Sequence, residues 1–115
     1  MANIINAFYT IRSAVAADDA SNPATAQGKF NPSLYGVESV AVDVVLGGTT
    51  PQWTVTPLYW SSTAATYVEG VPFVVDHNWR FITRVDGCTD FYVKCADKSG
   101  TSPTVSVYCT PIPVR

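Results

Sequence analysis

The chain has 115 residues, of which 47% are hydrophobic and only 14% are charged, and its formal net charge at pH 7 is −2. This length suits one domain with one core, and the hydrophobic content excludes wholesale disorder. The lack of excess positive charge argues against a nucleic-acid partner, and no apolar stretch is long enough to span a membrane. The first residues also lack the basic and apolar regions of a secretory signal, which predicts folding in a reducing cytoplasm.

The charged fraction is well below the usual value of about 25%. The surface must therefore consist largely of Ser, Thr, Asn, Tyr and apolar atoms. Two interpretations remain open. The surface is partly covered by another protein, or a β-sheet uses threonine and serine on its solvent side.

The first predicted element is a strand from Ile4 to Val15, a stretch rich in residues that favour the pleated sheet. Residues 16–36 follow without any period and contain two Asn-Pro breaks, which predicts an extended loop or arm. Three apolar side chains punctuate this stretch, namely Phe30, Leu34 and Tyr35. Either they fold back and cap one end of the domain, or the arm docks on a neighbouring subunit.

The middle of the chain predicts three further strands. The first runs from Val37 to Leu46 with alternating valines, and residues 47–51 (Gly-Gly-Thr-Thr-Pro) then predict a turn. The second runs from Gln52 to Trp60, where Pro57 indicates an edge strand or a bulge. The third is short, from Thr66 to Glu69.

The C-terminal part predicts an antiparallel meander. Side chains alternate from Trp79 to Val85, from Phe91 to Cys95, and from Thr104 to Cys109. Residues 86–87 (Asp-Gly) and 97–103 are turn formers between these runs. In total we expect about seven or eight strands, joined by turns every eight to twelve residues. This spacing predicts a single all-β domain over residues 1–115, an antiparallel β-sandwich of jelly-roll type.

The search for catalytic chemistry centres on the one histidine, His77, which follows Asp76. A nucleophile motif does not accompany them, so a loop between two strands explains the pair better than a catalytic dyad. The acidic residues Asp86 and Asp90 flank a predicted turn and are expected to be solvated. We therefore expect no enzymatic activity and no cofactor.

The three cysteines, Cys88, Cys95 and Cys109, lack the C-x₂-C spacing of a zinc site, and no metal site is expected. If the chain reverses near residues 99–100, Cys109 would lie opposite about Asp90 and therefore close to Cys88. A Cys88–Cys109 disulfide could then form after release into an oxidising medium. Buried thiols that pack as small hydrophobes are the favoured alternative.

Three tryptophans raise a sugar-binding hypothesis, because aromatic side chains on a sheet can stack against sugar rings. Trp79 has the parity of a core residue, and Trp53 is expected to share it. Trp60 and Tyr59 remain as candidates for an exposed platform.

The stretches QWTVTPLYW, YVEG, NWRFITRVDGCTDFYVKC and GTSPTVSVYCTPI resemble small structural proteins of tailed bacteriophages. The resemblance covers the chain from about Gln52 onward. Such proteins include capsid decoration, or cement, proteins, which are small β domains that lie on the capsid lattice and bridge capsomers, often as dimers or trimers. The resemblance implies a virion protein on the capsid surface, made in the host cytoplasm, whose partner is the major capsid protein.

The resemblance transfers no site motif residue by residue, so the capsid contact is predicted from the apolar residues of the arm. These are Phe30, Leu34 and Tyr35, with Ile4 and Ile5 as a second candidate. A receptor- or glycan-binding module of a tail fibre or baseplate is the alternative function, and a small hydrolase is a third hypothesis.

Overall fold

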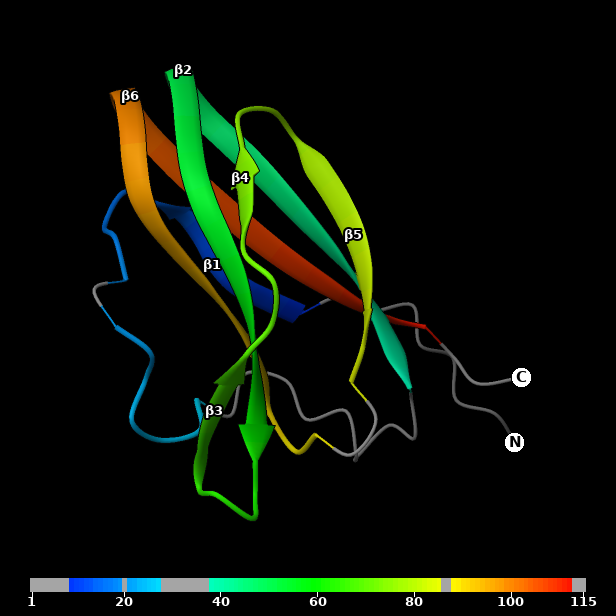
Figure 1. Cartoon of the computed structure of the whole chain (residues 1–115). Helices are drawn as coiled ribbons and strands as arrows, with labels where there is room; N and C mark the ends of the chain where they lie inside the picture. Colours follow the sequence, from blue (N-terminus) through cyan, green and yellow to red (C-terminus); the bar gives the residue numbers. More distant parts are fainter. Residues whose placement is uncertain (1–8, 20, 28–37, 86–87, 113–115) are drawn as a thin grey trace.

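The computed structural model describes residues 9–19, 21–27, 38–85 and 88–112. These residues form six strands and no helix, so none of them forms a helix that could cross a bilayer. The strands are β1 (Tyr9–Val15), β2 (Ser39–Ser61), β3 (Thr66–Glu69), β4 (Phe73–Val75), β5 (Trp79–Arg84) and β6 (Phe91–Ile112) (Figure 1). Every strand pair is antiparallel, which confirms the all-β prediction.

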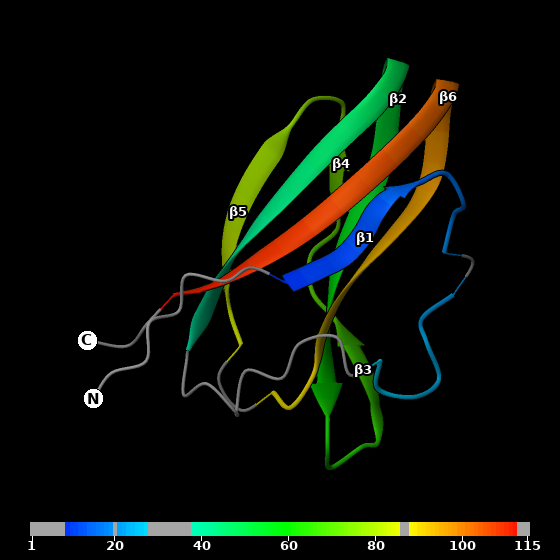
Figure 2. The same ribbon diagram turned by 180° about the vertical axis from the view of Figure 1, so that it is seen from behind.

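Two long strands organise the sheet. β2 and β6 pair along nearly their whole lengths, from Ser39 opposite Ile112 to Tyr59 opposite Phe91. β1 adds to the outer side of β6, while β3, β4 and β5 add to the outer side of β2. Figures 1 and 2 show β2 and β6 running together to one end of the molecule and folding back there. The six described strands therefore form one continuous sheet that is bent over on itself.

The bend is made by the same short sequence on both long strands. Residues 48–51 of β2 read Gly-Thr-Thr-Pro, and residues 100–103 of β6 read Gly-Thr-Ser-Pro. Gly48 and Gly100 have φ of 101° and 109°, and the third residue of each motif also has positive φ, 47° and 49°. A Cβ on either glycine would lie 2.5 Å from a carbonyl oxygen of the opposite strand. Only glycine permits this conformation and this approach without strain.

The strands that flank this corner repeat the symmetry. β1 pairs with the C-terminal half of β6 through Val15 and Val105, and β4 pairs with the C-terminal half of β2 through Val75 and Trp53. Trp53 and Val105 occupy equivalent positions after the two bends. The fold thus has an approximate internal two-fold symmetry that relates β2 to β6 and β4 to β1.

The symmetry continues beyond these flanking strands. After β4 the chain forms β5, which pairs with the N-terminal half of β2. After β1 the chain runs along the N-terminal half of β6, where the Asp19 amide donates to the Cys95 carbonyl at 2.8 Å. β5 and the segment after β1 therefore occupy equivalent places at the two outer edges of the folded sheet, although their sequences differ.

The core lies between the two halves of the folded sheet. Before the bend, the buried side chains of β2 include the even-numbered Val40, Val42 and Val44. After the bend they include the odd-numbered Trp53 and Val55, because irregular pairing at the corner shifts the alternation by one residue. The largest fully buried side chains are Trp53, Phe91, Leu58, Val40, Val42, Val44, Val55, Val85, Val93, Val105 and Val107. Full burial of one such side chain is worth roughly 1.5–3 kcal/mol, so this layer supplies most of the stability.

The prediction of seven or eight strands is not met by the described residues. Residues 39–46 of the first predicted run and the run 52–60 belong to one strand, β2, and the runs 91–95 and 104–109 belong to one strand, β6. Their turn-forming residues bend a strand without reversing the chain. The predicted meander is also wrong, because β5 and β6 do not pair with each other and both pair with β2. Whether the whole chain is a sandwich or jelly roll stays a prediction.

Pro57 was one reason to expect an edge strand over residues 52–60, and its surroundings explain why an interior strand tolerates it. β2 is an interior strand, yet Pro57 lies between the segment that pairs with β4 and the segment that pairs with β3. Its carbonyl accepts from the Gly70 amide at 2.8 Å on that side. The amide and the carbonyl of a strand residue point to the same side, so the missing N–H falls in the gap between β3 and β4.

Candidate binding surface

No group of three or more His, Cys, Asp or Glu side chains within the described ranges is arranged to hold a metal ion. His77 is exposed in the turn between β4 and β5. Its Nδ1 lies 2.6 Å from Asp76 Oδ1, and its ring meets the Trp79 ring edge-on with centroids 5.6 Å apart. The contacts of His77 are thus with its neighbours in the turn, as expected for a loop residue.

The cysteines are buried thiols, and the Cys88–Cys109 disulfide is not formed. Cys109 lies opposite Val42, not opposite Asp90, because the chain bends at residues 97–103 without reversing. The Cys88 thiol instead donates to the Asp90 carbonyl, with Sγ and O 2.6 Å apart. Burial raises the pKa of Cys95 and of Cys109 to about 12, so both thiols are protonated and unreactive at neutral pH.

The residues predicted to touch a capsid lie outside the described residues. They are Ile4, Ile5, Phe30, Leu34 and Tyr35. The described parts of the predicted arm, residues 16–19 and 21–27, run along the chain's own β6 and reach β3 (Figure 2). This part of the arm is therefore not extended away from the domain.

An ion pair fixes the start of this segment. Asp19 Oδ2 accepts from Arg12 Nη1 at 2.7 Å and from the Cys95 amide at 2.9 Å. The guanidinium of Arg12 also lies 5.6 Å from the ring centroid of Trp53, so it covers the core from the β1 side. The side chain of Arg12 is only 4% exposed, which makes this a largely buried ion pair.

A second polar cluster fixes the end of the segment. The Gln27 amide donates to the Tyr67 hydroxyl and to Asp90 Oδ2, both at 3.0 Å, and the Tyr67 hydroxyl donates to the same carboxylate. Burial, then the hydrogen bond to Asp90, raises the pKa of Tyr67 well above its usual value. Asn22 Nδ2 adds a bond of 2.9 Å to Glu69 on β3. We call β1 with residues 16–19 and 21–27 the covered edge.

The opposite edge has no such cover among the described residues. We call residues 71–84, which contain β4 and β5, the open edge. The side chains of Val71, Val74 and Ile82 are 71%, 68% and 65% exposed. Phe73 and Phe81, both half-buried, fill the space between β4 and β5 with ring centroids 5.1 Å apart. The open edge therefore offers apolar side chains to the solvent.

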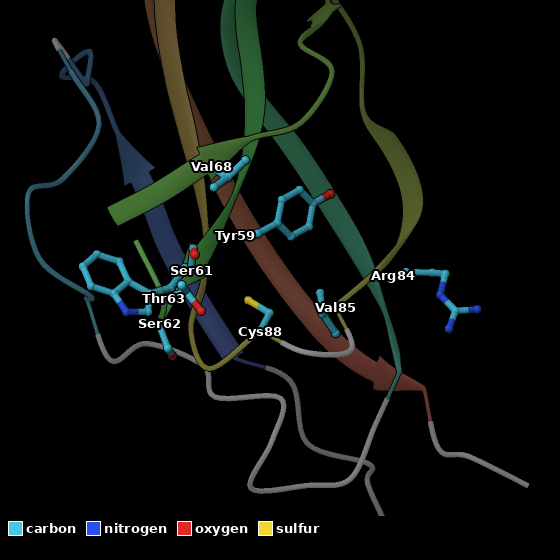
Figure 3. A pocket seen from close by; sticks show the side chains of 9 residues that line it. Tyr59, Ser61, Ser62, Thr63, Val68, Arg84, Val85 and Cys88 are labelled. Atoms are coloured by element: carbon cyan, nitrogen blue, oxygen red, sulfur yellow. The ribbon is translucent and has the colours of Figure 1, made fainter. Parts of the chain in front are cut away.

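Two hollows that share Tyr59 border the open edge. One, of about 390 Å³, is lined by Tyr59, Trp60, Ser61, Ser62, Thr63, Val68, Arg84, Val85 and Cys88 (Figure 3). The other, of about 200 Å³, is lined by Pro57, Tyr59, Val71, Phe73, Phe81, Ile82 and Thr83. Figure 3 shows Val68 and Tyr59 facing Val85 and Cys88 across the larger hollow, while the Arg84 side chain points away.

Tyr59 is held firmly between the two hollows. Its hydroxyl lies 2.5 Å from Thr83 Oγ1 on β5, and its ring packs against Phe91 with centroids 5.5 Å apart. A Cβ at Gly70 would come within 3.0 Å of the Tyr59 ring, so glycine makes room for the ring there. These contacts hold the Tyr59 side chain in one position between the two hollows.

Of the three tryptophans, Trp79 is the one whose exposure differs from the prediction. Trp53 is fully buried, as expected, and Trp60 is half-buried with its ring edge-on to Tyr67. Trp79, expected in the core, is 42% exposed. It is the first residue of β5, at an outer edge of the sheet, where the opposite layer does not cover it. It lines a third hollow of about 290 Å³.

No protein-family model, curated protein or solved structure matches this chain. The resemblance to phage structural proteins therefore stays a prediction.

Proposed function

We propose that this protein is a structural protein of a bacteriophage virion, a capsid decoration protein that binds the lattice of the major capsid protein and stabilises the head. One observation carries the proposal, the two exposed apolar side chains of the open edge, Val71 and Ile82, that line the same hollow. Exposed apolar side chains that adjoin one another support a role in protein–protein contact. The resemblance of the second half of the chain to phage structural proteins supports the choice of partner.

The energetics suit binding to a repeating lattice. Val71, Val74 and Ile82 are each about two-thirds exposed, and burial of one such side chain is worth roughly 1.5–3 kcal/mol when complete. A few of them give several kcal/mol per copy before the losses of freedom on binding are subtracted. Many copies across the capsomer seams would then raise the free energy needed to expand or rupture the capsid.

The remaining parts of the proposal concern the chain's own assembly. A sandwich-like plate formed by the folded sheet would lie on the capsid by its open edge. A homodimer or homotrimer, as in many decoration proteins, would bridge neighbouring capsomers. Apolar residues outside the described ranges, Ile4, Ile5, Phe30, Leu34 and Tyr35, would add a second contact.

The proposal is tested by cosedimentation with capsids of the phage that encodes this chain, purified without it. The variant Val71→Ser/Ile82→Ser removes two exposed apolar side chains of the open edge and is expected to lose capsid binding. The control is Val15→Ser, which changes a partly exposed valine on the covered edge and should bind normally. Binding of the double variant at the wild-type level would show that the open edge does not contact the capsid.

Deletion of residues 20–35 tests the second contact separately. We expect it to abolish capsid binding while leaving a folded domain, whose free energy of unfolding is lowered because the bonds of Asn22 and Gln27 are lost. A deleted chain that binds capsids at the wild-type level would remove Phe30, Leu34 and Tyr35 from the proposal.

The alternative function, a receptor- or glycan-binding module of a tail fibre or baseplate, is favoured by one observation. Trp79 is 42% exposed and is one of the residues that line a hollow with several polar side chains. This hollow shares no lining residue with the two hollows of the open edge.

A further inference from the structure

The hollow beside Trp79 lies where β5 begins, and its lining residues come from β2, β5, β6 and the turn before β5. Its lining includes two aromatic side chains, Trp79 and Tyr108, and three polar ones, Asp43, Asn78 and Arg80. We propose that it is a binding site for a neutral sugar, one pyranose ring wide. Asn78, Trp79 and Arg80 belong to the open edge, but the hollow does not include Val71 or Ile82, on which the capsid contact is argued, and the sugar proposal does not depend on that contact.

The aromatic part of the site is exposed but held in place. The Trp79 side chain is 42% exposed, and the His77 ring meets it edge-on at an interplanar angle of 82°. Trp79 is anchored in the sheet by its pairing with Val44 of β2. An indole held in this way presents an apolar surface to the solvent, and the C–H face of a pyranose ring is a matching apolar surface.

The polar part of the site is equally fixed. Arg80 Nε lies 2.5 Å from Asp43 Oδ1, and Arg80 Nη2 lies 2.9 Å from Asp43 Oδ2. This two-point pair holds both planar groups in one orientation, and each carboxylate oxygen can still accept a further hydrogen bond. The hydrogen bond from Arg80 holds the pKa of Asp43 below its ordinary value, so the carboxylate is ionised at neutral pH.

Asn78 adds a third planar group with a fixed orientation. Its Oδ1 accepts from the Leu46 amide at 2.9 Å, so its Nδ2 is the end that can donate to a ligand. Carboxylate, guanidinium and amide groups can each bond two neighbouring hydroxyls of a sugar. Because all three are ordered before the ligand arrives, little freedom is lost when it binds.

Size and charge select the ligand class. The hollow of about 290 Å³ is at the small end of ligand pockets, which suits one ring and not an oligosaccharide in full. Arg80 and Asp43 neutralise each other, so neither an anionic nor a cationic sugar is favoured. An apolar side chain of a partner protein would fill the hollow but would leave the exposed polar groups without a ligand, so the sugar is the better match.

A site of this size and openness binds weakly, with an expected dissociation constant on the order of millimolar. Many copies on one particle would raise the overall avidity by several orders of magnitude. That use of the site depends on the proposed capsid role, whereas the site itself does not.

The first test is NMR titration of the isolated protein, following the indole N–H signals. The probes are methyl β-D-glucopyranoside, methyl β-D-galactopyranoside, methyl α-D-mannopyranoside and methyl N-acetyl-β-D-glucosaminide, each added to about 50 mM to saturate a millimolar site. At least one is expected to shift the Trp79 signal and leave that of buried Trp53 unchanged. The proposal is overturned if none of them shifts the Trp79 signal.

Variants separate the sugar site from unspecific effects. Trp79→Ala and Asp43→Asn are each expected to weaken binding at least tenfold, as judged by the remaining backbone shifts. Trp60→Phe is the matched control, because it changes the half-buried tryptophan of the other hollow and should bind as the wild type does. Shifts that survive Trp79→Ala would overturn the assignment.

A multivalent form identifies the source of the sugar. The biotinylated chain, gathered on streptavidin, is applied to arrays of bacterial surface polysaccharides and of animal glycans. Binding to either array, lost in the Trp79→Ala form, supports the site and names its source. If it binds neither array but is captured by capsids through Trp79, the hollow accepts a protein side chain, and the sugar proposal is wrong.

Discussion

The covered edge and the open edge occupy equivalent places in an approximately two-fold symmetric sheet, yet they are finished in opposite ways. On the covered edge, the Arg12–Asp19 ion pair closes the side of the core, and the following residues are bonded onto β6 and β3. On the open edge, two half-buried phenylalanines close the core, and the valines and isoleucine around them face the solvent. Both edges are closed over the core, but among the described residues the open edge carries the more exposed apolar side chains.

This difference separates stability from binding. Substitutions on the covered edge should lower the free energy of unfolding and spare partner binding, whereas substitutions of exposed residues on the open edge should do the reverse.

The largest effect is expected from Arg12→Ala. The change leaves the Asp19 carboxylate without its ion-pair partner and uncovers the Trp53 ring, which should cost about 2–4 kcal/mol of unfolding free energy. Urea denaturation measures this. Arg80→Ala is the control, because its ion pair with Asp43 is exposed and should contribute less than about 1 kcal/mol. Equal losses in the two variants would contradict the account of the covered edge.

The bend that both edges share comes next. Gly48→Ala and Gly100→Ala each place a Cβ 2.5 Å from a carbonyl oxygen at positive φ, and each should cost roughly 1–3 kcal/mol. Thermal unfolding followed by circular dichroism measures both. The symmetry of the corner predicts losses of similar size. A variant as stable as the wild type would show that the corner is not built as described.

Tyr67→Phe should release the end of the covered edge at a smaller loss. The change removes the hydroxyl that bonds to Asp90 and to the Gln27 amide, and leaves the Gln27 amide as the remaining donor to Asp90 Oδ2. Loss of a buried hydrogen bond to a charged group costs about 1.5–3 kcal/mol. Hydrogen exchange should become faster at residues 21–27 and stay unchanged at β5. If exchange at Gln27 is unaffected, the cluster does not fix this segment.

The smallest effect is expected from alkaline pH. In the folded state, burial raises the pKa of the Cys95 and Cys109 thiols to about 12, whereas the ordinary pKa of a cysteine thiol is 9.0. The unfolded state therefore loses these protons first. The stabilisation is fully present below pH 9 and is lost as the pH rises toward 12. Denaturation midpoints across this range should fall less steeply in Cys109→Ala than in the wild type. An identical slope would contradict the burial of this thiol.

Much of the local structure could be predicted from the sequence, because alternation within each strand depends only on which face is buried. Val40, Val42 and Val44, and likewise Phe91 and Val93, are buried as their parity predicts. The bends could not be predicted, because Gly-Thr-Thr-Pro permits a chain reversal as readily as a sharp bend. The pairing partner decides between them, and that partner is a strand about fifty residues away in the chain.

The candidate surface was largely missed for a related reason. Parity placed Trp79 on the inner face of its strand, but exposure depends on whether another layer covers that position. In the sequence, Val71 and Ile82 are recognisable only as apolar residues that do not lie on the predicted core face. Their position at an uncovered edge became visible once β4 and β5 were both seen to pair with β2.

The most direct test of the contrast between the two edges is hydrogen exchange of the wild-type chain, free and bound to capsids, read out by mass spectrometry. The account predicts slower exchange on binding in residues 71–84 and unchanged exchange in β1 and residues 16–27. Protection of the covered edge with none at residues 71–84 would contradict it.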